Sequence, residues 1–546
     1  MKKKAKWILI PLICLLIIGA VSYYIYLPAV NIHSVDFWFF IFAILVVTTF
    51  LTFLFGNRNR TEKIIGSARK EEIPAQIHSN KLFRASAIIT LIFIVVFIVG
   101  SLLSSPIINA KKYRELIQLK ERNFSEDIEQ ISYNEIPLLD KDSAALLGSR
   151  KMGSMMEYVS QFEVADNYAQ INLNDKPARV TPLKYANLLK WFTNRSKGLP
   201  AYIKIDMTTQ NAECVKLSEG IKYSESEHFS RYIYRYLRFH FPTYIFDTIN
   251  FEIDENGTPY WICPVKDYTI GLFGGQTIKN VVIVNAVNGE IANYKIDEVP
   301  SWVDRVYSAE LLTSYYNYYG TLKHGFLNSV LSQKDCLQTT EGYNYIALED
   351  DVWVYTGVTS VVSDESLVGF VLMNQRTAET RYYSVAGAKE YSAMASAEGK
   401  VQNLSYTATF PLLLNISNEP TYFIALKDSA GLVKKYAMVN IEQYTIVAIG
   451  DTITECEKDY KNQLRSNHVT VQGESGNEKK ASGTIETIAP CVIDGTTHYY
   501  VILKGQKPIY DIDISNHVEI VRFHEGDFIS FTYSEGTDTN SVIDLK

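Results

Sequence analysis

The residues with the clearest potential for chemistry form a row of arginines in the stretch SEHFSRYIYRYLRFH. Arg231, Arg235 and Arg238 are spaced so that a helix would place all three on one face. Guanidinium groups in this arrangement could bind a carboxylate, a phosphate-bearing wall polymer or lipid head groups. The alternative is a solvated helix face whose arginines pair with Glu225 and Glu227. This row is the candidate anion- or partner-binding site of the sequence.

Other residue types lack the spacing that catalysis or metal binding requires. GLFGG (271–275) has no phosphate-binding lysine and lies between expected strands, so we interpret it as a hairpin turn. The histidines are scattered, and the acidic run 349–351, with 364–365 downstream, lacks calcium-loop spacing although its oxygens could hold a hard cation. The sequence has no GxSxG elbow. We therefore expect no catalytic residue, no metal and no cofactor, and an enzyme is the less favoured class.

The six cysteines include no CxxC pair. Cys14 lies in an apolar run, and the five later ones are Cys214, Cys263, Cys336, Cys456 and Cys491. Cys263 and Cys491 lie in strand-like stretches, where a buried thiol behaves as a small hydrophobe. We expect buried thiols at both, in preference to disulfides, and the disulfide state of the five stays open.

Three long apolar runs dominate the N-terminal block. Residues 7–26, 37–55 and 85–105 carry no charge, and a helix over each would cross a hydrocarbon core of about 30 Å. The first run is too long for a signal peptide and has no small-x-small cleavage site after it, so we expect an uncleaved span. The sequence predicts a multi-pass protein of the cell membrane with three spans.

The distribution of lysine and arginine predicts the orientation. Eleven of them lie before the first run or in the loop 57–84, against five in KKYRELIQLKER (111–122) beyond the third run. The N-terminus is therefore expected in the cytoplasm and the region after residue 106 outside. Residues 1–122 carry a net charge of +10 in a chain of −7, which leaves −17 on the remainder and makes nucleic acid a poor partner.

Beyond the membrane block the pattern predicts an α+β fold. We expect a helical stalk (107–135), two α+β regions (136–300 and 301–464), a polar linker (465–483) and a small OB-like or SH3-like β-barrel (484–546). Within the first region, 160–182 should form a hairpin that turns at Asn174-Asp175, followed by helices over 183–194 and 226–240. The basic unit is a helix packed on an antiparallel sheet.

This helix-plus-hairpin unit recurs along the chain. After 226–240 come the strand candidates IFDTINFEID, TPYWICPV, KNVVIVNA and GEIANYKI, with a predicted two-residue turn at Asn288-Gly289. GTPYWICPV (257–265) has a counterpart in NEPTYFIALKD (418–428), and VVIVNAVNGEI in YAMVNIEQYTI. The sequence predicts at least two copies, with a degenerate one near 183–207.

The hairpin of this unit resembles the PepSY domain of bacterial envelope proteins. The residues that carry the resemblance are Val282, Val284, Asn285, Asn288, Gly289, Glu290 and Ile291. It covers about residues 226–297 and, more loosely, 368–450, where Glu442-Gln443 replaces the Asn-Gly turn. The resemblance implies an external module that modulates enzymes or binds partners and brings no catalytic residues.

These features favour a non-catalytic, membrane-anchored protein of a Gram-positive-type envelope that binds or regulates an envelope protein or peptide. An anionic wall polymer or a lipid is a further candidate partner. Two alternatives stay open: an envelope hydrolase with an unrecognised active site, and a structural subunit of a membrane complex.

Overall fold

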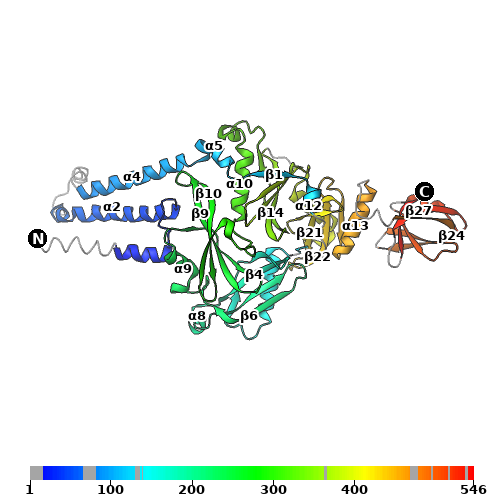
Figure 1. The fold of residues 1–546 in the computed structure, drawn as a ribbon, viewed down its shortest axis with the longest axis horizontal. Helices are drawn as coiled ribbons and strands as arrows, with labels where there is room; N and C mark the ends of the chain where they lie inside the picture. Colours follow the sequence, from blue (N-terminus) through cyan, green and yellow to red (C-terminus); the bar gives the residue numbers. More distant parts are fainter. Residues whose placement is uncertain are drawn as a thin grey trace.

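The computed structural model describes residues 16–64, 81–128, 136–137, 139–361, 366–467, 478–493, 496–514, 517–534 and 539–545. The chain is an α+β protein in three parts (Figure 1). Long apolar helices project from one end, a body of small sheets occupies the middle, and a β-barrel lies at the other end.

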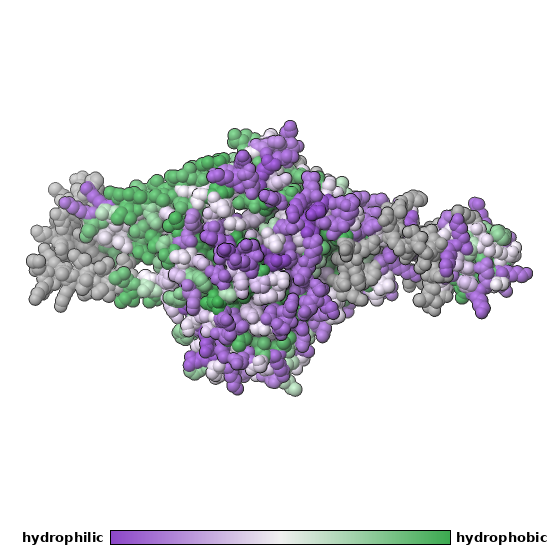
Figure 2. All heavy atoms as spheres, in the orientation of Figure 1, coloured by the Kyte–Doolittle hydropathy of each residue, from purple (hydrophilic) through white to green (hydrophobic). Residues whose placement is uncertain are grey.

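Among the residues that the structure describes, two helices are long and apolar enough to cross a membrane. They are α2 (Val35–Ile64), apolar over Val35–Phe53, and α4 (Lys81–Leu103). Almost none of their apolar surface is buried in the protein, which distinguishes them from the core helices of a soluble domain (Figure 2). The prediction of three spans is therefore supported for two. Of the first run, the structure describes only a short apolar helix, Leu16–Tyr26, and the rest lies outside the described residues.

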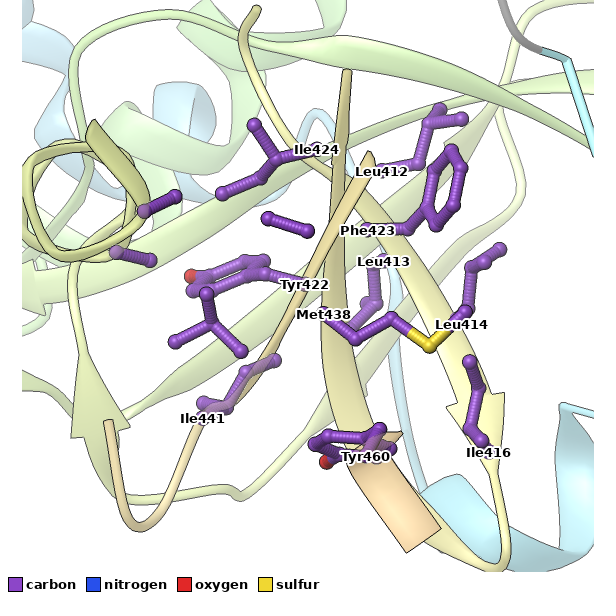
Figure 3. Close-up of a cluster of buried hydrophobic side chains, with 14 of the residues drawn as sticks. Leu412, Leu413, Leu414, Ile416, Tyr422, Phe423, Ile424, Met438, Ile441 and Tyr460 are labelled. Atoms are coloured by element: carbon purple, nitrogen blue, oxygen red, sulfur yellow. The ribbon is translucent and has the colours of Figure 1, made fainter. Parts of the chain in front are cut away.

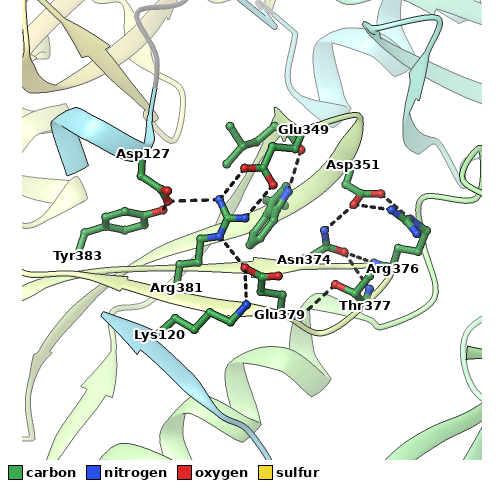
Figure 4. A network of polar contacts seen from close by, with 12 residues as sticks. Lys120, Asp127, Glu349, Asp351, Asn374, Arg376, Thr377, Glu379, Arg381 and Tyr383 are labelled. Carbon is green, nitrogen blue, oxygen red and sulfur yellow. Dashed lines mark hydrogen bonds and ion pairs between the residues drawn. The ribbon is translucent and has the colours of Figure 1, made fainter. Parts of the chain in front are cut away.

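The expected helical stalk is wrong in its centre. After α5 (Pro106–Arg114), residues Leu119–Arg122 form strand β1, and a short helix α6 (Phe124–Asp127) follows. β1 pairs in parallel with β17 (Thr380–Tyr383), a partner about 260 residues away that local periodicity cannot reveal. Lys120 of β1 forms an ion pair with Glu379 at 3.2 Å (Figure 4). The segment is part of the body and does not hold it away from the membrane helices.

The body repeats one unit four times. In each unit a helix precedes five antiparallel strands, and the first two strands lie end to end along the long third strand, while the fourth and fifth follow on its other side. The first unit is α7 (Lys141–Gly153), β2 (Phe162–Val164), β3 (Ala169–Leu173), β4 (Lys176–Tyr185), β5 (Leu199–Asp206) and β6 (Ala212–Ile221), with α8 (Leu188–Asn194) inserted after β4. The second is α9 (Ile233–His240), β7 (Ile245–Phe246), β8 (Asn250–Ile253), β9 (Pro259–Ile270), β10 (Gly274–Asn285) and β11 (Ile291–Lys295).

The other two units keep the same order. The third is α10 (Ala309–Thr321), β12 (Leu337–Thr339), β13 (Asn344–Leu348), β14 (Asp351–Ser360), β16 (Gly369–Asn374) and β17, with α11 (Phe326–Val330) after α10 and β1 added at its edge. The fourth is α12 (Glu390–Lys400), β19 (Thr407–Ala408), β20 (Leu412–Ile416), β21 (Glu419–Lys427), β22 (Val433–Asn440) and β23 (Val447–Gly450), followed by α13 (Ile453–Ser466). The two counterparts recognised in the sequence, 257–265 and 418–428, are β9 and β21, which occupy the same place in their units.

The units pack in chain order, and each neighbouring pair shares a hydrophobic core. Trp261 and Val282 of the second sheet pack with the first unit, and Ile262 and Val281 pack on α10 and the third sheet. The third and fourth units share the core drawn in Figure 3, where Tyr422 and Met438 lie among the leucines of β20 and Tyr460 of α13. Alternate residues of one strand thus face different neighbours, as the pleat of a strand requires.

The hairpin turns are of two kinds. Asn174-Asp175, as predicted, is a two-residue turn with both residues at positive φ. The Asn288-Gly289 hairpin exists, with Val284 opposite Ile291, but the predicted two-residue turn is wrong. Its loop extends from Asn285 to Glu290, and the Asn285 side chain accepts hydrogen bonds from the backbone N–H groups of Val287 and Asn288. In this loop only Gly289 has a positive φ, +81°.

The glycine-rich stretch 271–275 forms the β9–β10 turn, as predicted, and its glycines serve a close approach to the membrane helices. The backbone N–H groups of Leu272 and Phe273 donate to the Ser104 hydroxyl at the end of α4, at 2.7 and 3.1 Å. A Cβ on Gly271 would lie 2.5 Å from that hydroxyl. Phe273 packs against the ring of Trp38 in α2. The tip of this hairpin thus contacts both α2 and the end of α4.

The C-terminal barrel is formed by β24 (Glu478–Ile493), β25 (Thr496–Leu503), β26 (Ile509–Asp513), β27 (Phe528–Ser534) and β28 (Asn540–Leu545), which close in the order β24-β25-β26-β28-β27. β24 begins inside the predicted linker. The cysteines from Cys214 onward are free thiols; Cys263 is buried as expected, but Cys491 is exposed on β24, so the expectation of burial there is wrong.

Candidate functional site

The predicted arginine row does not lie on one helix. A 3-10 turn (Phe229–Arg231) is separated from α9 by Tyr232, whose ψ of 114° is extended. Phe229 has a φ of +52°, so the chain reverses locally before α9 begins. The apolar and basic residues of 226–240 have helical spacing, but the tertiary contacts of the first turn override it. Arg231 therefore belongs to a different element from Arg235 and Arg238.

Two of these arginines, Arg235 and Arg238, hold the end of the first apolar helix against the body. Arg238 is buried, and its Nε donates to the carbonyl of Leu27 at 2.9 Å, while Nη1 donates to the carbonyl of Tyr244 at 2.6 Å. Arg235 lies over the ring of Tyr24, 4.1 Å from its centroid. Arg231 donates to the carbonyl of Arg195 at 2.7 Å. The predicted pairing with glutamates is not their role either, because Glu227 accepts from Tyr185 and Trp191.

Replacing Arg238 by alanine should release the end of the first apolar helix from the body. Several backbone carbonyls would lose their donor in a partly buried place, at a cost of about 1–3 kcal/mol for each group left unpaired. We expect faster proteolysis of the segment after Tyr26 in detergent-solubilised protein, and a lower melting temperature. Arg231→Ala is the control, since Arg231 is a half-buried donor to one carbonyl. Equal proteolysis of both variants would contradict the role of Arg238 in holding the end of this helix.

The acidic run at 349–351 is neutralised by arginines of the same sheet. Glu349 receives two hydrogen bonds from Arg381, and Asp351 receives two from Arg376 (Figure 4). Asp364 and Glu365 lie outside the described residues. Among the residues that the structure does describe, no group of three or more His, Cys, Asp and Glu side chains could hold a metal ion.

A cavity within the body is the candidate ligand site. It has a volume of about 460 Å³ and is lined by residues of all four units and their connections. Its polar lining includes Tyr168, Arg179, Asn250, Arg305, Tyr343 and Tyr345. Cavities of this size typically hold small-molecule ligands.

Several buried polar atoms around this cavity have no hydrogen-bond partner in the described structure. They are Tyr168 Oη, Gln170 Nε2, Arg179 Nε and Arg305 Nε, with Asp304 Oδ1 nearby. Arg179 is only 5% exposed, and the one hydrogen bond found for its guanidinium goes from Nη2 to Gln170 Oε1 at 3.1 Å. Buried polar groups without a partner are rare because each costs about 1–3 kcal/mol. Of these residues, Tyr168, Arg179 and Arg305 line the cavity.

Comparison of the four units shows that Gln170 and Arg179 occupy positions at which the other units carry core residues. Gln170 lies directly opposite Arg179 where β3 pairs with β4. In every unit the first strand pairs with the end of the third strand, and this pairing gives a common reference position. Relative to it, the equivalent pairs in the other units are Phe251–Trp261, Tyr345–Val354 and Leu413–Tyr422. Those positions help to form the cores between sheets, whereas in the first unit they carry a buried amide and a buried charge.

Two arginines, Arg179 and Arg305, line the cavity. Burial, helped by the positive charge of the nearby Arg305, lowers the pKa of Arg179 to about 10, while Tyr345, Asp140 and Asp142 partly oppose this shift. Of the three carboxylates in the lining, Asp140 pairs with Lys427, Asp247 pairs with Lys266 at 3.0 Å, and Glu310 accepts a hydrogen bond from the Tyr343 hydroxyl at 2.6 Å. Neither of the two arginines forms an ion pair among the described residues. An anion would compensate them both.

Behind Arg305 lie two buried acids, Glu252 and Asp304. The Glu252 carboxylate accepts the backbone N–H groups of Asp304 and Arg305, at 3.0 and 3.1 Å. Burial raises the pKa of Glu252 to about 7. Burial and the neighbouring Glu252 also raise the pKa of Asp304 well above its usual value. These carboxyls therefore cancel little of the positive charge of the cavity below neutral pH.

The raised pKa of Glu252 makes stability depend on pH. An acid with a pKa near 4.5 in the unfolded chain and about 7 in the folded one binds its proton more tightly when folded. Its stabilising contribution is complete below pH 4.5 and is lost as the pH rises through 7. We expect the melting temperature of Glu252→Gln to fall less than that of the wild type between these values. Parallel pH curves for the two proteins would contradict the raised pKa.

Sequence reasoning missed Arg179, Arg305, Tyr168 and Gln170. One signal was present: aligning KPARVTPLKY of β4 with TPYWICPVKD of β9 places Arg179 against Trp261. A charge at a core position of a repeated strand indicates a departure from packing. Recognising it required knowledge that 176–185 is the third strand of a unit.

No protein-family model matches this chain, and no curated protein matches it.

Proposed function

We propose that this protein is a membrane-anchored extracytoplasmic receptor that binds a small carboxylate- or phosphate-bearing ligand in this cavity. The observation that carries the proposal is the Arg179 guanidinium, buried and with Nε lacking any partner in the described residues. A buried cation without a counter-charge is strongly destabilising, because water no longer solvates it. A bound anion supplies that charge.

The chemistry of the lining favours a ligand with planar anionic oxygens. The guanidinium fork matches carboxylate and phosphate geometry and can donate two parallel hydrogen bonds. Arg305, a second arginine of the lining, adds a further guanidinium group. Phe410 and the rings of Tyr343 and Tyr345 supply apolar surface for the body of the ligand.

The N-terminal helices support a membrane location. The proposed arrangement places the N-terminus in the cytoplasm and residues 123–546 outside, because of the eleven-to-five excess of basic residues in the N-terminal flank and the loop 57–84. Protease added to intact protoplasts should then digest the body. A body protected until the membrane is permeabilised would reverse the orientation.

The resemblance of the second unit to PepSY fits a binding or regulatory module, and ligand binding gives such a module a signal to respond to. An envelope hydrolase and a structural subunit are the alternatives. A hydrolase would consume the anionic ligand, so recovery of unchanged ligand after incubation separates the receptor from it. A structural subunit would not bind the ligand at all.

Isothermal titration of the purified full-length protein in detergent tests the proposal. The probes are inorganic phosphate, citrate, glycerol 3-phosphate and an N-acetyl amino acid. We expect at least one to bind the wild type, and Arg179→Met or Arg305→Met to weaken that binding at least tenfold. Arg122→Met, which removes an exposed arginine on β1, is the matched control. Equal affinity of Arg122→Met and Arg179→Met would place the anion outside the cavity.

A further inference from the structure

The end of the body next to α2 and α4 carries a row of exposed apolar side chains on α8, the 3-10 turn and α9. They are Leu188 (62% exposed), Leu189 (76%), Phe192 (60%), Phe229 (63%) and Phe239 (56%). Exposed large hydrophobic residues scattered singly are ordinary, but a contiguous group marks an interaction surface. We name this group the α8–α9 patch.

The α8–α9 patch continues from the end of the first apolar helix. The ring of Phe239 lies against those of Tyr23 and Tyr24, with centroids 6.5 and 6.2 Å apart. Phe229 and Phe192 flank Trp191, at 5.9 and 6.4 Å. These contacts place Phe239 beside the end of the helix, and Phe229 and Phe192 beside Trp191 of α8.

A second group lies beside the end of α4, on α5 and α11. It comprises Ile107 (55% exposed), Ile108 (54%), Leu327 (72%), Val330 (57%) and Leu331 (78%), and we name it the α5–α11 patch. α5 begins at Pro106, directly after α4, and Phe326 of α11 packs on the buried Tyr113 of α5. This patch is thus continuous with a candidate membrane span.

The two patches lie at the same level of the molecule. α5, α8 and α9 all occupy the end of the body from which α2 and α4 project, on either side of the β9–β10 sheet (Figure 1). The tip of that sheet is fixed to Ser104 and packs against Trp38, an aromatic residue of the kind that prefers the membrane–water interface. The level of the patches is therefore the level at which the helices would leave the bilayer.

Basic residues accompany both patches. Lys111, Lys112 and Arg114 form the last turn of α5. Arg195 lies over the ring of Phe192, 4.8 Å from its centroid, and Lys190 is on α8. Apolar side chains bordered by lysine and arginine are typical of segments that lie in the interface of a bilayer with anionic head groups.

We propose that the α8–α9 and α5–α11 patches rest in the head-group region of the outer leaflet, so that the body is seated on the bilayer at two points. The proposal rests on the proposed membrane anchoring and goes beyond ligand binding. It also gives a physical reason for Lys111, Lys112 and Arg114 on the outer side, since lipid phosphates there would neutralise them.

Depth-dependent fluorescence quenching in vesicles tests whether the two patches contact the bilayer. Single cysteines at positions 189 and 331, each carrying an environment-sensitive fluorophore, are made with Cys14 and Cys491 replaced by serine. The full-length protein is reconstituted into phosphatidylglycerol–phosphatidylethanolamine vesicles with spin-labelled lipid. The control is position 256, exposed in the loop at the far end of β9, about 40 Å along the strand from the tip that contacts α2 and α4.

We expect strong quenching by the lipid-borne label at 189 and 331, and little at 256. Leu189→Glu, in protein labelled at 331 only, should leave the quenching at 331 in place, because the two patches contact the bilayer separately. Quenching at 189 and 331 no greater than at 256 would overturn the proposal that the two patches lie in the head-group region. Failure of the protein to float with the vesicles would overturn membrane anchoring itself, which separates the two failures.

Discussion

Replacing Gln170 by leucine and Arg179 by methionine together should stabilise the ligand-free protein by about 1–4 kcal/mol. The double variant gives the first unit an apolar cross-strand pair like Leu413–Tyr422 of the fourth. It removes a buried cation and an amide whose Nε2 has no partner in the described structure. The measurement is the melting temperature of the full-length protein in detergent, followed by intrinsic tryptophan fluorescence.

The single variant Gln170→Leu should have the opposite effect. It deletes the acceptor that Arg179 Nη2 uses and leaves the buried guanidinium with less compensation. Destabilisation by the single change and stabilisation by the double change would identify the charge itself as the strained group. A double variant less stable than the wild type would mean that Arg179 supports the fold and is compensated in a way the cavity does not show.

Gly289→Ala should destabilise the second unit by about 2–4 kcal/mol, from two sources that add. The residue has a φ of +81°, where an L side chain is strained. A Cβ there would also lie 2.4 Å from the ring of Tyr223. That ring is packed against Tyr236, whose hydroxyl donates to the Gly289 carbonyl at 2.7 Å, so it has little room to move. A large fall in melting temperature is expected.

Gly325→Ala is the matched control for this change. Gly325 has a similar φ, +86°, but nothing lies within 4 Å of the Cβ it would gain. Its replacement should cost only the backbone strain, about 1–2 kcal/mol. If the two variants melt at the same temperature, the Tyr223 ring yields to the new methyl group and the contact is weaker than the structure indicates.

The local features of the fold were predictable from the sequence, and the long-range ones were not. Hairpins such as the one at Asn174-Asp175 follow from turn residues and alternation, which act over a few positions. Strand β1 was missed because its partner, β17, is distant in sequence, and the charged stretch that contains it favours a helix locally. The number of units was underestimated because their helices and turns differ while their topology is shared.

The candidate site shows a similar division. The arginine row was noticed because of its spacing, but the break at Tyr232 and the contacts of Arg235 and Arg238 with the first helix depend on tertiary structure. Arg179 carries no local motif. Its significance comes from burial and from an unpartnered Nε, which a single sequence does not display, and from an alignment with the equivalent strands, which requires knowledge of where each unit begins.

The most direct test of the central claim is the order of stability of the wild type and the Gln170→Leu, Arg179→Met double variant as the anion concentration rises. The probe is whichever of the four anions binds the wild type most tightly. Without it, the double variant should melt at the higher temperature. At a hundredfold excess over the wild-type dissociation constant the wild type should gain about 2.7 kcal/mol and approach or overtake the variant, which at tenfold weaker binding or less should gain no more than about 1.4 kcal/mol. Parallel shifts of both proteins with anion concentration would contradict an anion site at Arg179.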